Sequence, residues 1–271
     1  MMTTRSLNTQ IDRYQEQGYV VVRALIVDDE IESVHRKITE VIEQRQDFPA
    51  ELVQLEPLVR TGELEAESFE LGVRKLFRVA RHCAFFRRFA FHPRMVAAVQ
   101  ELLGPDLFLV QSMTLMKPPR VSTPKVWHQD NAYFRLAPAH VLGVWIAGDE
   151  ATVENGCMHI VPGSHQAGVV KHAGDGDAFG IVDEPRDDQL LAVPLSPGDA
   201  LIFHGELQHF TPANTTNGQR RSLQYHYAAT PVRWLGPENG VAHFDPEVHI
   251  SGQRRASSPV LGDAADRPTG D

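Results

Sequence analysis

Apolar residues in the first third of the chain recur mostly at helical spacing. Segment 28–46 has apolar side chains three or four positions apart, which places them on one face of a helix: Ile31, Val34, Ile38, Val41 and Ile42. Asp28 and Asp29 stand where an N-cap and a first-turn acid belong. The pattern predicts an amphipathic helix, preceded by a β-branched strand at 19–22 and by a small helix that ends near Gln17.

Two more helices are predicted in this part of the chain, after a loop. Residues 47–66 are rich in proline, glycine and acidic residues, which is typical of a loop. Helical spacing returns at 83–91, and Pro93 then opens a helix that ends at Gly104. Residues 1–106 are therefore expected to form a mostly helical flanking region.

From position 107 the pattern changes to short apolar or alternating runs separated by proline and glycine. We expect seven or eight strands, with runs at 107–117, 125–134, 140–147, 157–161, 190–194, 200–204 and 221–229. So many short strands favour a sandwich or barrel, so the fold class is mainly β with flanking helices. We interpret 1–271 as a single domain with a β core at 107–230 and a C-terminal extension at 231–271. The last part of the extension, 251–271, is expected to be loose because Gly, Ser, Pro, Asp and Arg dominate it.

The charge and the cysteine content exclude several classes of protein. The chain has 26 Lys and Arg residues and 35 Asp and Glu residues, which gives a formal net charge of -9. A general nucleic-acid binder needs a basic face, so this class is not favoured. Cys83 and Cys157 are the only cysteines and lie far apart, which provides neither a disulfide framework nor a Cys-based zinc site. No apolar run approaches the roughly 18–20 residues that span a bilayer, and the N-terminus lacks the apolar core of a signal peptide. We therefore expect a cytoplasmic protein without nucleic-acid or membrane partners, with its oligomeric state open.

The strongest candidate for chemistry is the sequence His128-Gln129-Asp130. In a strand, residues i and i+2 point to the same face, so an imidazole and a carboxylate would stand side by side. A second histidine can come from 197–209, where a Pro-Gly turn feeds a buried strand and His209 follows it. Two histidines and one carboxylate leave three adjacent metal positions open, which is the facial arrangement of non-haem Fe(II) enzymes.

Other histidines compete for these roles. His204 rivals His209, but its place inside an apolar strand favours an ordinary buried histidine. His243 and Asp245 have the same spacing as the pair in the candidate motif, yet no strand follows them to supply a third ligand. The candidate motif at 128–130 is therefore preferred.

Arg220 follows His209 by eleven residues, and Ser222 comes two residues later. On a strand, this spacing aims a guanidinium and a hydroxyl at the same side. The planar fork of arginine holds both oxygens of a carboxylate and the hydroxyl adds a donor, so lysine would not be equivalent. We predict a carboxylate site at Arg220, with Arg221 facing the opposite way.

Four stretches of the chain match one family pattern in order and spacing: MTLMKPP at 113–119, HQD at 128–130 with YF at 133–134, ENGCMHIVPGSH at 154–165, and the segment 197–220. They resemble the phytanoyl-CoA dioxygenase family of Fe(II)- and 2-oxoglutarate-dependent oxygenases. The resemblance covers roughly 107–230 and is weaker over the N-terminal helices. It implies a double-stranded β-helix, a cupin-like jelly roll flanked by helices, and the use of Fe(II), the cosubstrate 2-oxoglutarate and O2.

The resemblance also implies roles for particular residues. His128, Asp130 and His209 would hold the iron as the catalytic centre, and Arg220 with Ser222 would bind the far carboxylate of 2-oxoglutarate. Further cosubstrate contacts are implied for five residues: Lys75, Gln111, Met113, Trp145 and Thr211.

The reaction that the resemblance implies is hydroxylation of an unactivated C–H bond of a small molecule, with release of succinate and CO2. Asp130 favours this over halogenation, because a related halogenase carries a small residue at that position. Desaturation, cyclisation or epimerisation of a natural-product intermediate would use the same iron site. Two other classes stay open, a zinc-binding cupin-like enzyme and a non-catalytic cupin-like module, although both leave Arg220 unexplained.

Residues next to the expected site are candidates for the substrate wall: Asn131, Tyr133, Phe134 and Phe210. An acyl-CoA substrate would need a basic mouth, to which Arg120, Lys125 and Arg135 are candidate contributors, although scattered cations are more typical of a solvated surface. Two positions depart from the family pattern. Thr211 replaces the usual serine but keeps a hydroxyl, and Phe210 replaces the glycine that commonly follows the distal histidine.

Overall fold

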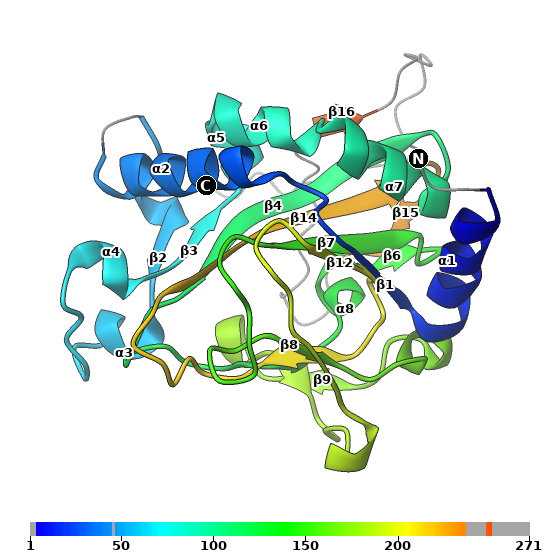
Figure 1. The fold of residues 1–271 in the computed structure, drawn as a ribbon. Coiled ribbons are helices and arrows are strands. Elements are labelled where there is room, and N and C mark those ends of the chain that lie inside the picture. The colour runs from blue at the N-terminus through cyan, green and yellow to red at the C-terminus, as the bar shows by residue number, and fades with distance from the viewer. Residues whose placement is uncertain (1–3, 45–46, 237–247, 251–271) are drawn as a thin grey trace, which may run out of the picture.

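The computed structural model describes residues 4–44, 47–236 and 248–250, and two antiparallel sheets form its centre (Figure 1). The larger sheet runs in spatial order through β1 (Tyr19–Val22), β12 (Ala200–His204), β7 (Val141–Ala147), β14 (Arg220–Ala229), β4 (Leu107–Lys117), β3 (Val73–Phe77) and β2 (Val53–Leu55), with β16 (Val248–Ile250) paired to β4. The smaller sheet runs through β11 (Leu191–Val193), β8 (Met158–Ile160), β13 (His209–Thr211) and β5 (Lys125–His128). Two short pairs complete the strands: β6 (Leu136–Ala137) with β15 (Arg233–Trp234), and β9 (His172–Ala173) with β10 (Gly180–Ile181).

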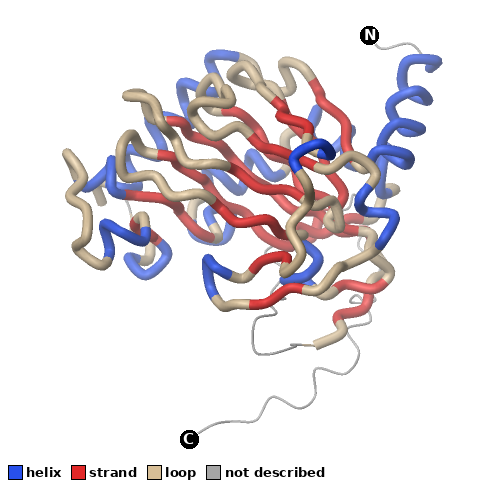
Figure 2. Tube along the Cα trace, turned by 90° about the horizontal axis from the view of Figure 1, so that it is seen from below, coloured by secondary structure: helices blue, strands red, loops and turns tan. Residues whose placement is uncertain are grey.

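The two sheets pack face to face. Trp145, Leu201 and Phe203 of the larger sheet form one apolar cluster with Met158 and Ile160 of the smaller sheet. Figure 2, seen from below, shows the long strands lying side by side. This arrangement is a double-stranded β-helix, or jelly roll, so the predicted fold class is confirmed.

Helices cover the outer face of the larger sheet (Figure 1). The α-helices are α1 (Thr4–Gln17), α2 (Asp28–Ile42), α3 (Pro57–Arg60), α4 (Phe69–Gly72), α5 (Val79–His82), α6 (Ala84–Ala90), α7 (Pro93–Leu103) and α8 (Asp130–Phe134), and the 3-10 turns are η1 (Ala50–Leu52), η2 (Ser164–Ala167), η3 (Gly176–Ala178) and η4 (Asp187–Gln189). All five apolar residues that predicted the first long helix are buried in α2 against this sheet. Within the part of the chain that the structure describes, no helix combines the length and the apolar character needed to cross a bilayer.

Strand β14 alternates between two faces, which decides where the functional side chains point. Leu223, Tyr225 and Tyr227 are buried in the cluster that includes the covering helices. The hydroxyls of Tyr225 and Tyr227 donate to the carbonyls of Phe86, at 3.1 Å, and Ala90, at 3.0 Å. The alternate residues of the strand therefore face the smaller sheet: Arg220, Ser222, Gln224 and His226.

Several predicted elements differ in the structure. The strand predicted at 125–134 stops as β5 at His128, and α8 follows it until Arg135 takes a left-handed conformation with φ 53°. The loop predicted at 47–66 contains β2, because these residues find a backbone partner in β3 at the edge of the sheet. That pairing is a tertiary contact which local composition does not reveal.

The C-terminal extension adds the strand β16, which pairs with β4. The segment predicted to be loose, 251–271, lies outside the described residues, as does the competing pair His243 and Asp245. The predicted long helix at 28–46 ends at Ile42, and 45–46 are also outside the described residues. The single-domain interpretation stays a prediction.

Candidate metal centre

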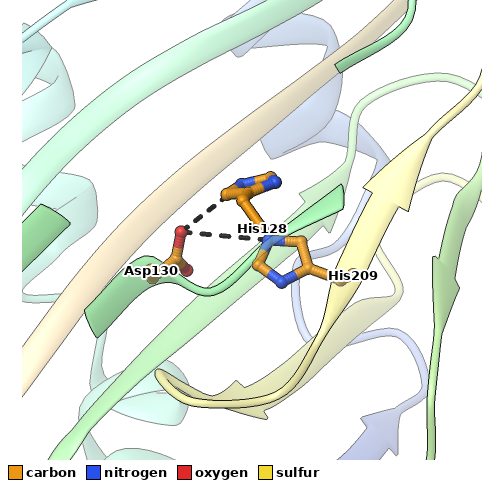
Figure 3. Close-up of side chains that lie close together, drawn as sticks. All are labelled: His128, Asp130 and His209. Carbon is orange, nitrogen blue, oxygen red and sulfur yellow. Dashed lines mark ion pairs between the residues drawn. The ribbon is translucent and has the colours of Figure 1, made fainter. Parts of the chain in front are cut away.

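His128 and Asp130 lie at the point where β5 becomes α8 (Figure 3). Gln129 between them keeps an extended backbone, with φ -126° and ψ 132°, so the side chains of its two neighbours point to one side. The same-side geometry expected from a continuous strand is retained although Asp130 begins a helix. Gln129 itself is fully buried, and its amide donates to the carbonyls of Gly168 and Glu206 at 2.9 and 2.6 Å.

His209, the first residue of β13, lies directly opposite His128 in the pair that β13 forms with β5. Opposed residues of an antiparallel pair share a face, and the two imidazole centroids are 4.1 Å apart. The competing His204 lies instead beside Tyr14 and His165, with centroid distances of 6.2 and 5.0 Å. The second histidine of the cluster is therefore His209.

A single carboxylate oxygen faces both histidines (Figure 3). Asp130 Oδ1 lies 3.7 Å from His128 Nε2 and 3.8 Å from His209 Nε2, and the three candidate ligand atoms fall within 4.8 Å of one another. The Nδ1 atoms of the histidines donate to the carbonyls of Val126, at 2.8 Å, and Leu207, at 2.9 Å, which leaves both Nε2 lone pairs directed at the centre. Two imidazoles and one carboxylate form the 2-His-1-carboxylate donor set that suits Fe(II).

Burial sets the protonation of this centre. The three side chains belong to residues at most 8% exposed, and burial lowers the pKa of both imidazoles below the ordinary histidine value of 6.5. Burial raises the pKa of the Asp130 carboxyl, but His226, His209 and His128 lower it further, so the net pKa lies below the ordinary 3.8. At neutral pH the centre offers two uncharged nitrogens and one carboxylate, which a metal ion can bind without displacing protons.

The metal-free protein is expected to lose stability as the pH falls below about 6.5. Burial lowers the folded-state pKa values of His128, His209 and His204, that of His204 to about 4. Below the unfolded value the unfolded chain binds more protons at these sites, so stability increases with pH across this window. Thermal unfolding of EDTA-treated protein as a function of pH measures the effect. A melting temperature that stays constant as the pH falls through this window would contradict it.

A residue that sequence reasoning did not single out holds the other oxygen of the carboxylate. His226 Nε2 on β14 lies 2.9 Å from Asp130 Oδ2. A carboxylate only accepts, so this nitrogen carries the proton and donates it. The Gln224 amide lies 2.9 Å from the same nitrogen, and the Phe134 ring packs edge-on with a centroid distance of 4.9 Å. Because Oδ2 is engaged, Asp130 has Oδ1 free for a metal. The sequence offers one indication of this role: His226 follows Arg220 and Ser222 on the same strand by an even number of residues, so it faces the same side.

The substitution His226→Leu is expected to weaken divalent-metal binding by roughly 10- to 100-fold, the usual cost of losing a hydrogen-bond partner of a metal ligand. Without the donor, Oδ2 is buried unpaired and the carboxylate is free to rotate. The variant His226→Gln keeps an N–H donor and is expected to recover most of the affinity. Mn(II) titration followed by EPR compares the two variants, with circular dichroism as the check on folding. Equal Mn(II) affinity in His226→Leu and wild type would show that this contact does not orient Asp130.

Arg220 lies at the start of β14 on the same inner face as His226. It is 2% exposed; Nη1 donates to Ser222 Oγ at 2.9 Å and Nη2 to the Gly156 carbonyl at 3.2 Å, whereas Nε has no partner among the described residues. The guanidinium lies over the Trp145 ring, 5.2 Å from its centroid, and burial lowers its pKa to about 10. No carboxylate of the described ranges pairs with it. A buried cation in this state calls for an anionic ligand.

Three other residues expected at the cosubstrate lie on strands next to β14. Gln111 of β4 lies opposite His226, and Met113 and Trp145 lie on either side of Gln224. Opposed residues in adjacent strands share a face, so these side chains belong to the inner surface of the larger sheet. Their contacts with a cosubstrate stay a prediction.

Lys75 and Thr211, the other two expected contacts, lie at the margins of this surface. Lys75 of β3 is paired with Leu115 of β4, and burial lowers the pKa of its ammonium group. Thr211 follows His209 by two residues on β13, and its carbonyl lies 3.5 Å from Lys117 Nζ. The roles of both residues at a cosubstrate stay predictions.

Of the two aromatic residues of α8 that are expected in the substrate wall, one contacts a residue of the triad. Tyr133 packs edge-on against His128 with a centroid distance of 5.9 Å, so it borders the metal centre. Phe134 is buried in an apolar cluster and packs against His226, which is not a candidate metal ligand. Tyr133 is the better placed of the two to meet a substrate.

Phe210 lies on the opposite face of β13 from the metal centre. Its ring contacts those of Trp127 and His159, with centroid distances of 4.4 and 5.0 Å. Adjacent residues of a strand point to opposite faces, and His209 takes the inner one. The structure therefore corrects the expectation that Phe210 belongs to the substrate wall.

Asn131 is occupied by bonds that hold α8 in place. Its Nδ2 donates to the Leu136 carbonyl at 3.1 Å and to Glu206 Oε1 at 3.0 Å, and its Oδ1 accepts from the Leu136 amide at 2.9 Å. The side chain is buried, and these bonds use its amide on both sides. The structure gives Asn131 a positioning role in place of the expected substrate contact.

Comparisons of the sequence with known proteins give a family match. The family model described as phytanoyl-CoA dioxygenase (PhyH) matches residues 14–222. A probable phytanoyl-CoA dioxygenase of Caenorhabditis elegans is 27% identical over 79% of this chain and 73% of the relative. Phytanoyl-CoA dioxygenase domain-containing protein 1 of Bos taurus is 28% identical over 84% of this chain and 94% of the relative.

Comparisons of the structure find the same fold in solved oxygenases. The epimerase SnoN, solved with Fe3+, alpha ketoglutarate and nogalamycin RO, superposes with a TM-score of 0.67 at 23% identity, over 93% of this chain and 98% of that chain. EctD from S. alaskensis with bound Fe superposes with a TM-score of 0.69 at 20% identity, over 87% of this chain and 80% of that chain. At these identities the likeness concerns the fold.

Proposed function

This chain belongs to the phytanoyl-CoA dioxygenase family, and we propose that it hydroxylates an unactivated C–H bond of a small molecule. The reaction uses Fe(II), 2-oxoglutarate and O2 and releases succinate and CO2. The enzyme class follows from the family and from the His128, Asp130 and His209 triad. The identity of the substrate and the outcome of the oxidation belong to the proposal.

The observation that carries the proposal is the buried guanidinium of Arg220 on the same inner face as the residue that holds Asp130. Arg220 Nε has no partner among the described residues, and no described carboxylate pairs with this guanidinium. Ser222 holds the guanidinium in place, since its hydroxyl accepts from Nη1 at 2.9 Å and donates to the Leu115 carbonyl at 3.1 Å. A dicarboxylic keto acid fits both features, because one end meets the guanidinium and the other end can meet the metal. A zinc-binding cupin-like enzyme or a non-catalytic module leaves this buried charge without a purpose.

The chain's own residues hold and shield the reactants. When bound, Fe(II) with 2-oxoglutarate and O2 supplies the oxidising power that breaks the C–H bond. His128 and His209 present fixed Nε2 atoms because backbone carbonyls hold their Nδ1 protons. His226 keeps Oδ2 of Asp130 engaged, so the carboxylate would offer a bound metal one oxygen, Oδ1. The apolar body of Trp145 covers the guanidinium of Arg220 and excludes water from the cosubstrate site.

Hydroxylation is favoured over halogenation because Asp130 occupies the position that a halide would need. Desaturation, cyclisation and epimerisation need the same residues and differ in how the substrate lies beside the metal. Solved relatives of the same fold include an epimerase and a carbocyclase, both named from nogalamycin biosynthesis. Product analysis distinguishes these outcomes.

The test begins without oxygen. Adding 2-oxoglutarate to the protein with Fe(II) is expected to produce a weak visible charge-transfer band, which zinc cannot give. O2 is then admitted in a succinate-release screen over small amino acids, phosphonates, acyl-CoAs and natural-product intermediates, and products are identified by mass spectrometry. Tight zinc binding with no charge-transfer band and no succinate would contradict the proposal.

A further inference from the structure

Lys125 lies beside the metal centre and is not explained by the metal or by the cosubstrate. Its Nζ donates to the Tyr133 hydroxyl at 2.9 Å and to the Asp177 carbonyl at 3.1 Å. Tyr133 in turn donates to the Phe179 carbonyl at 2.7 Å and packs edge-on against His128. Two hydrogen bonds thus hold the ammonium group in place, and the ring of Tyr133 lies between it and the candidate metal ligand His128.

The charge of Lys125 has no matching partner. In the described part of the chain it forms no ion pair, and its two hydrogen-bond acceptors are neutral oxygens. Lys75 is close enough to contribute to the lowered pKa of Lys125, and both lysines lower the pKa of Asp177. Burial lowers the pKa of Lys125 to about 8, because the ammonium group loses part of its contact with water.

Cationic side chains gather around Asp177, since Lys75, Arg74, Lys125 and Arg60 all lower the pKa of its carboxyl group. Asp177 is a single carboxylate facing Lys75 and Lys125. The resemblance to the family assigns Lys75 to the cosubstrate, which brings its own negative charge. Lys125 then remains as a partly buried cation without a direct ion pair, although the carboxylates of Asp177 and Asp130 lie near enough to favour its charged form, and a bound anion would stabilise it further.

The other cations that the sequence offered for a basic mouth are placed elsewhere. Arg120 is paired with Glu67, and both side chains are more than half exposed to solvent. Arg135 directs its Nε to the Gly236 carbonyl at 2.8 Å, beyond the end of α8. Of these three candidate cations, Lys125 is the one that borders the metal centre.

We propose that Lys125 binds an anionic group of the primary substrate, a carboxylate or a phosphate, and so places a neighbouring C–H bond at the metal centre. This inference rests on the proposed function and narrows its substrate class to small anions. Tyr133 positions the ammonium group and offers an aromatic face to the carbon chain next to the anion. A lysine suits this task because its three donors surround a compact charge that accepts anions of different shapes.

The experiment measures whether binding depends on the charge of the ligand. The full chain is loaded with Fe(II) and 2-oxoglutarate without oxygen, and the charge-transfer band is followed during titration with matched probes. The pairs are hexanoate and hexanamide, benzoate and benzamide, and hexyl phosphate and hexanol. Three proteins are compared: wild type, Lys125→Met, and the control Lys171→Met, which changes an exposed lysine beside β9.

Wild type and Lys171→Met are expected to bind at least one anion about tenfold or more tightly than its neutral partner, as one charge-assisted hydrogen bond provides. Lys125→Met is expected to bind both members of each pair equally weakly. Preference for hexyl phosphate over the carboxylates identifies a phosphate group, and the reverse identifies a carboxylate. If Lys125→Met still prefers the anion over its neutral partner, or if no anion changes the band of wild type, the inference is wrong. A normal charge-transfer band in the same experiment would still support the proposed function. Failure to form the band contradicts the proposed function, and the inference falls with it.

Discussion

The Asp130→Ala variant is expected to lose divalent-metal affinity and 2-oxoglutarate turnover by more than about 100-fold, because losing only an outer partner of a metal ligand already costs 10- to 100-fold. Asp130 supplies the one negative charge among the three candidate ligands, and its Oδ1 faces both imidazoles. Alanine removes the ligand and also leaves His226 without an acceptor. Mn(II) titration and succinate release measure the two losses separately.

The matched control is His159→Ala. His159 lies on the neighbouring strand β8, where its ring contacts Phe210 on the face away from the metal centre. It is a histidine of the same sheet with no contact to the triad, so metal affinity and turnover are expected to stay within about twofold of wild type. Full 2-oxoglutarate turnover in Asp130→Ala would mean that the ligand assignment is wrong.

The Arg220→Met variant is expected to raise the KM for 2-oxoglutarate by roughly 10- to 100-fold. A hydrogen-bonded charge contributes about 1.5–3 kcal/mol, and each 1.4 kcal/mol corresponds to a factor of ten. The melting temperature of the protein without cosubstrate is expected not to fall, because the substitution removes a buried charge that has no counter-ion. Loss of ligand binding without loss of stability separates a binding residue from a structural one.

Arg221 provides the control for Arg220 at the next position of the same strand. It faces the other way and holds Asp149 in a paired ion bridge, with Nη2 to Oδ1 at 2.7 Å and Nε to Oδ2 at 2.9 Å. Arg221→Met is expected to show the opposite result, a lower melting temperature with the KM for 2-oxoglutarate unchanged. Both properties are read from thermal unfolding and from steady-state succinate release. If the two variants behave alike, the assignment of Arg220 to the cosubstrate fails.

Sequence periodicity was sufficient to predict the buried or functional face where all the residues concerned belong to one short segment. The alternation on β14 and the motif at 128–130 are short-range patterns, and each places its side chains on one face by backbone geometry alone. The five apolar positions of α2 are all buried for the same reason. In these cases the pattern that predicts the element also predicts which face is functional or buried.

The remaining features depend on contacts between distant segments. His226 meets Asp130 across 96 positions of sequence, and no local pattern marks that pairing. Phe210 was expected at the site because it is adjacent to His209, but adjacency in a strand means opposite faces. Asn131 adjoins the metal ligand in sequence and yet bonds to Leu136 and Glu206, because α8 replaces the expected strand.

Strand β14 carries both Arg220 and His226, six residues and about 20 Å apart at the usual rise of a strand. If one residue were inserted or deleted between them, the two side chains would point to opposite faces of the sheet, because a shift by one position exchanges the two faces of a strand. Related chains are therefore expected to keep the length of this strand constant. The β9–β10 hairpin, which carries the carbonyls beside Lys125 and Tyr133, belongs to neither large sheet. A change of length in that hairpin would therefore alter the surroundings of Lys125 and Tyr133 without shifting the register of the strands that carry Arg220 and His226.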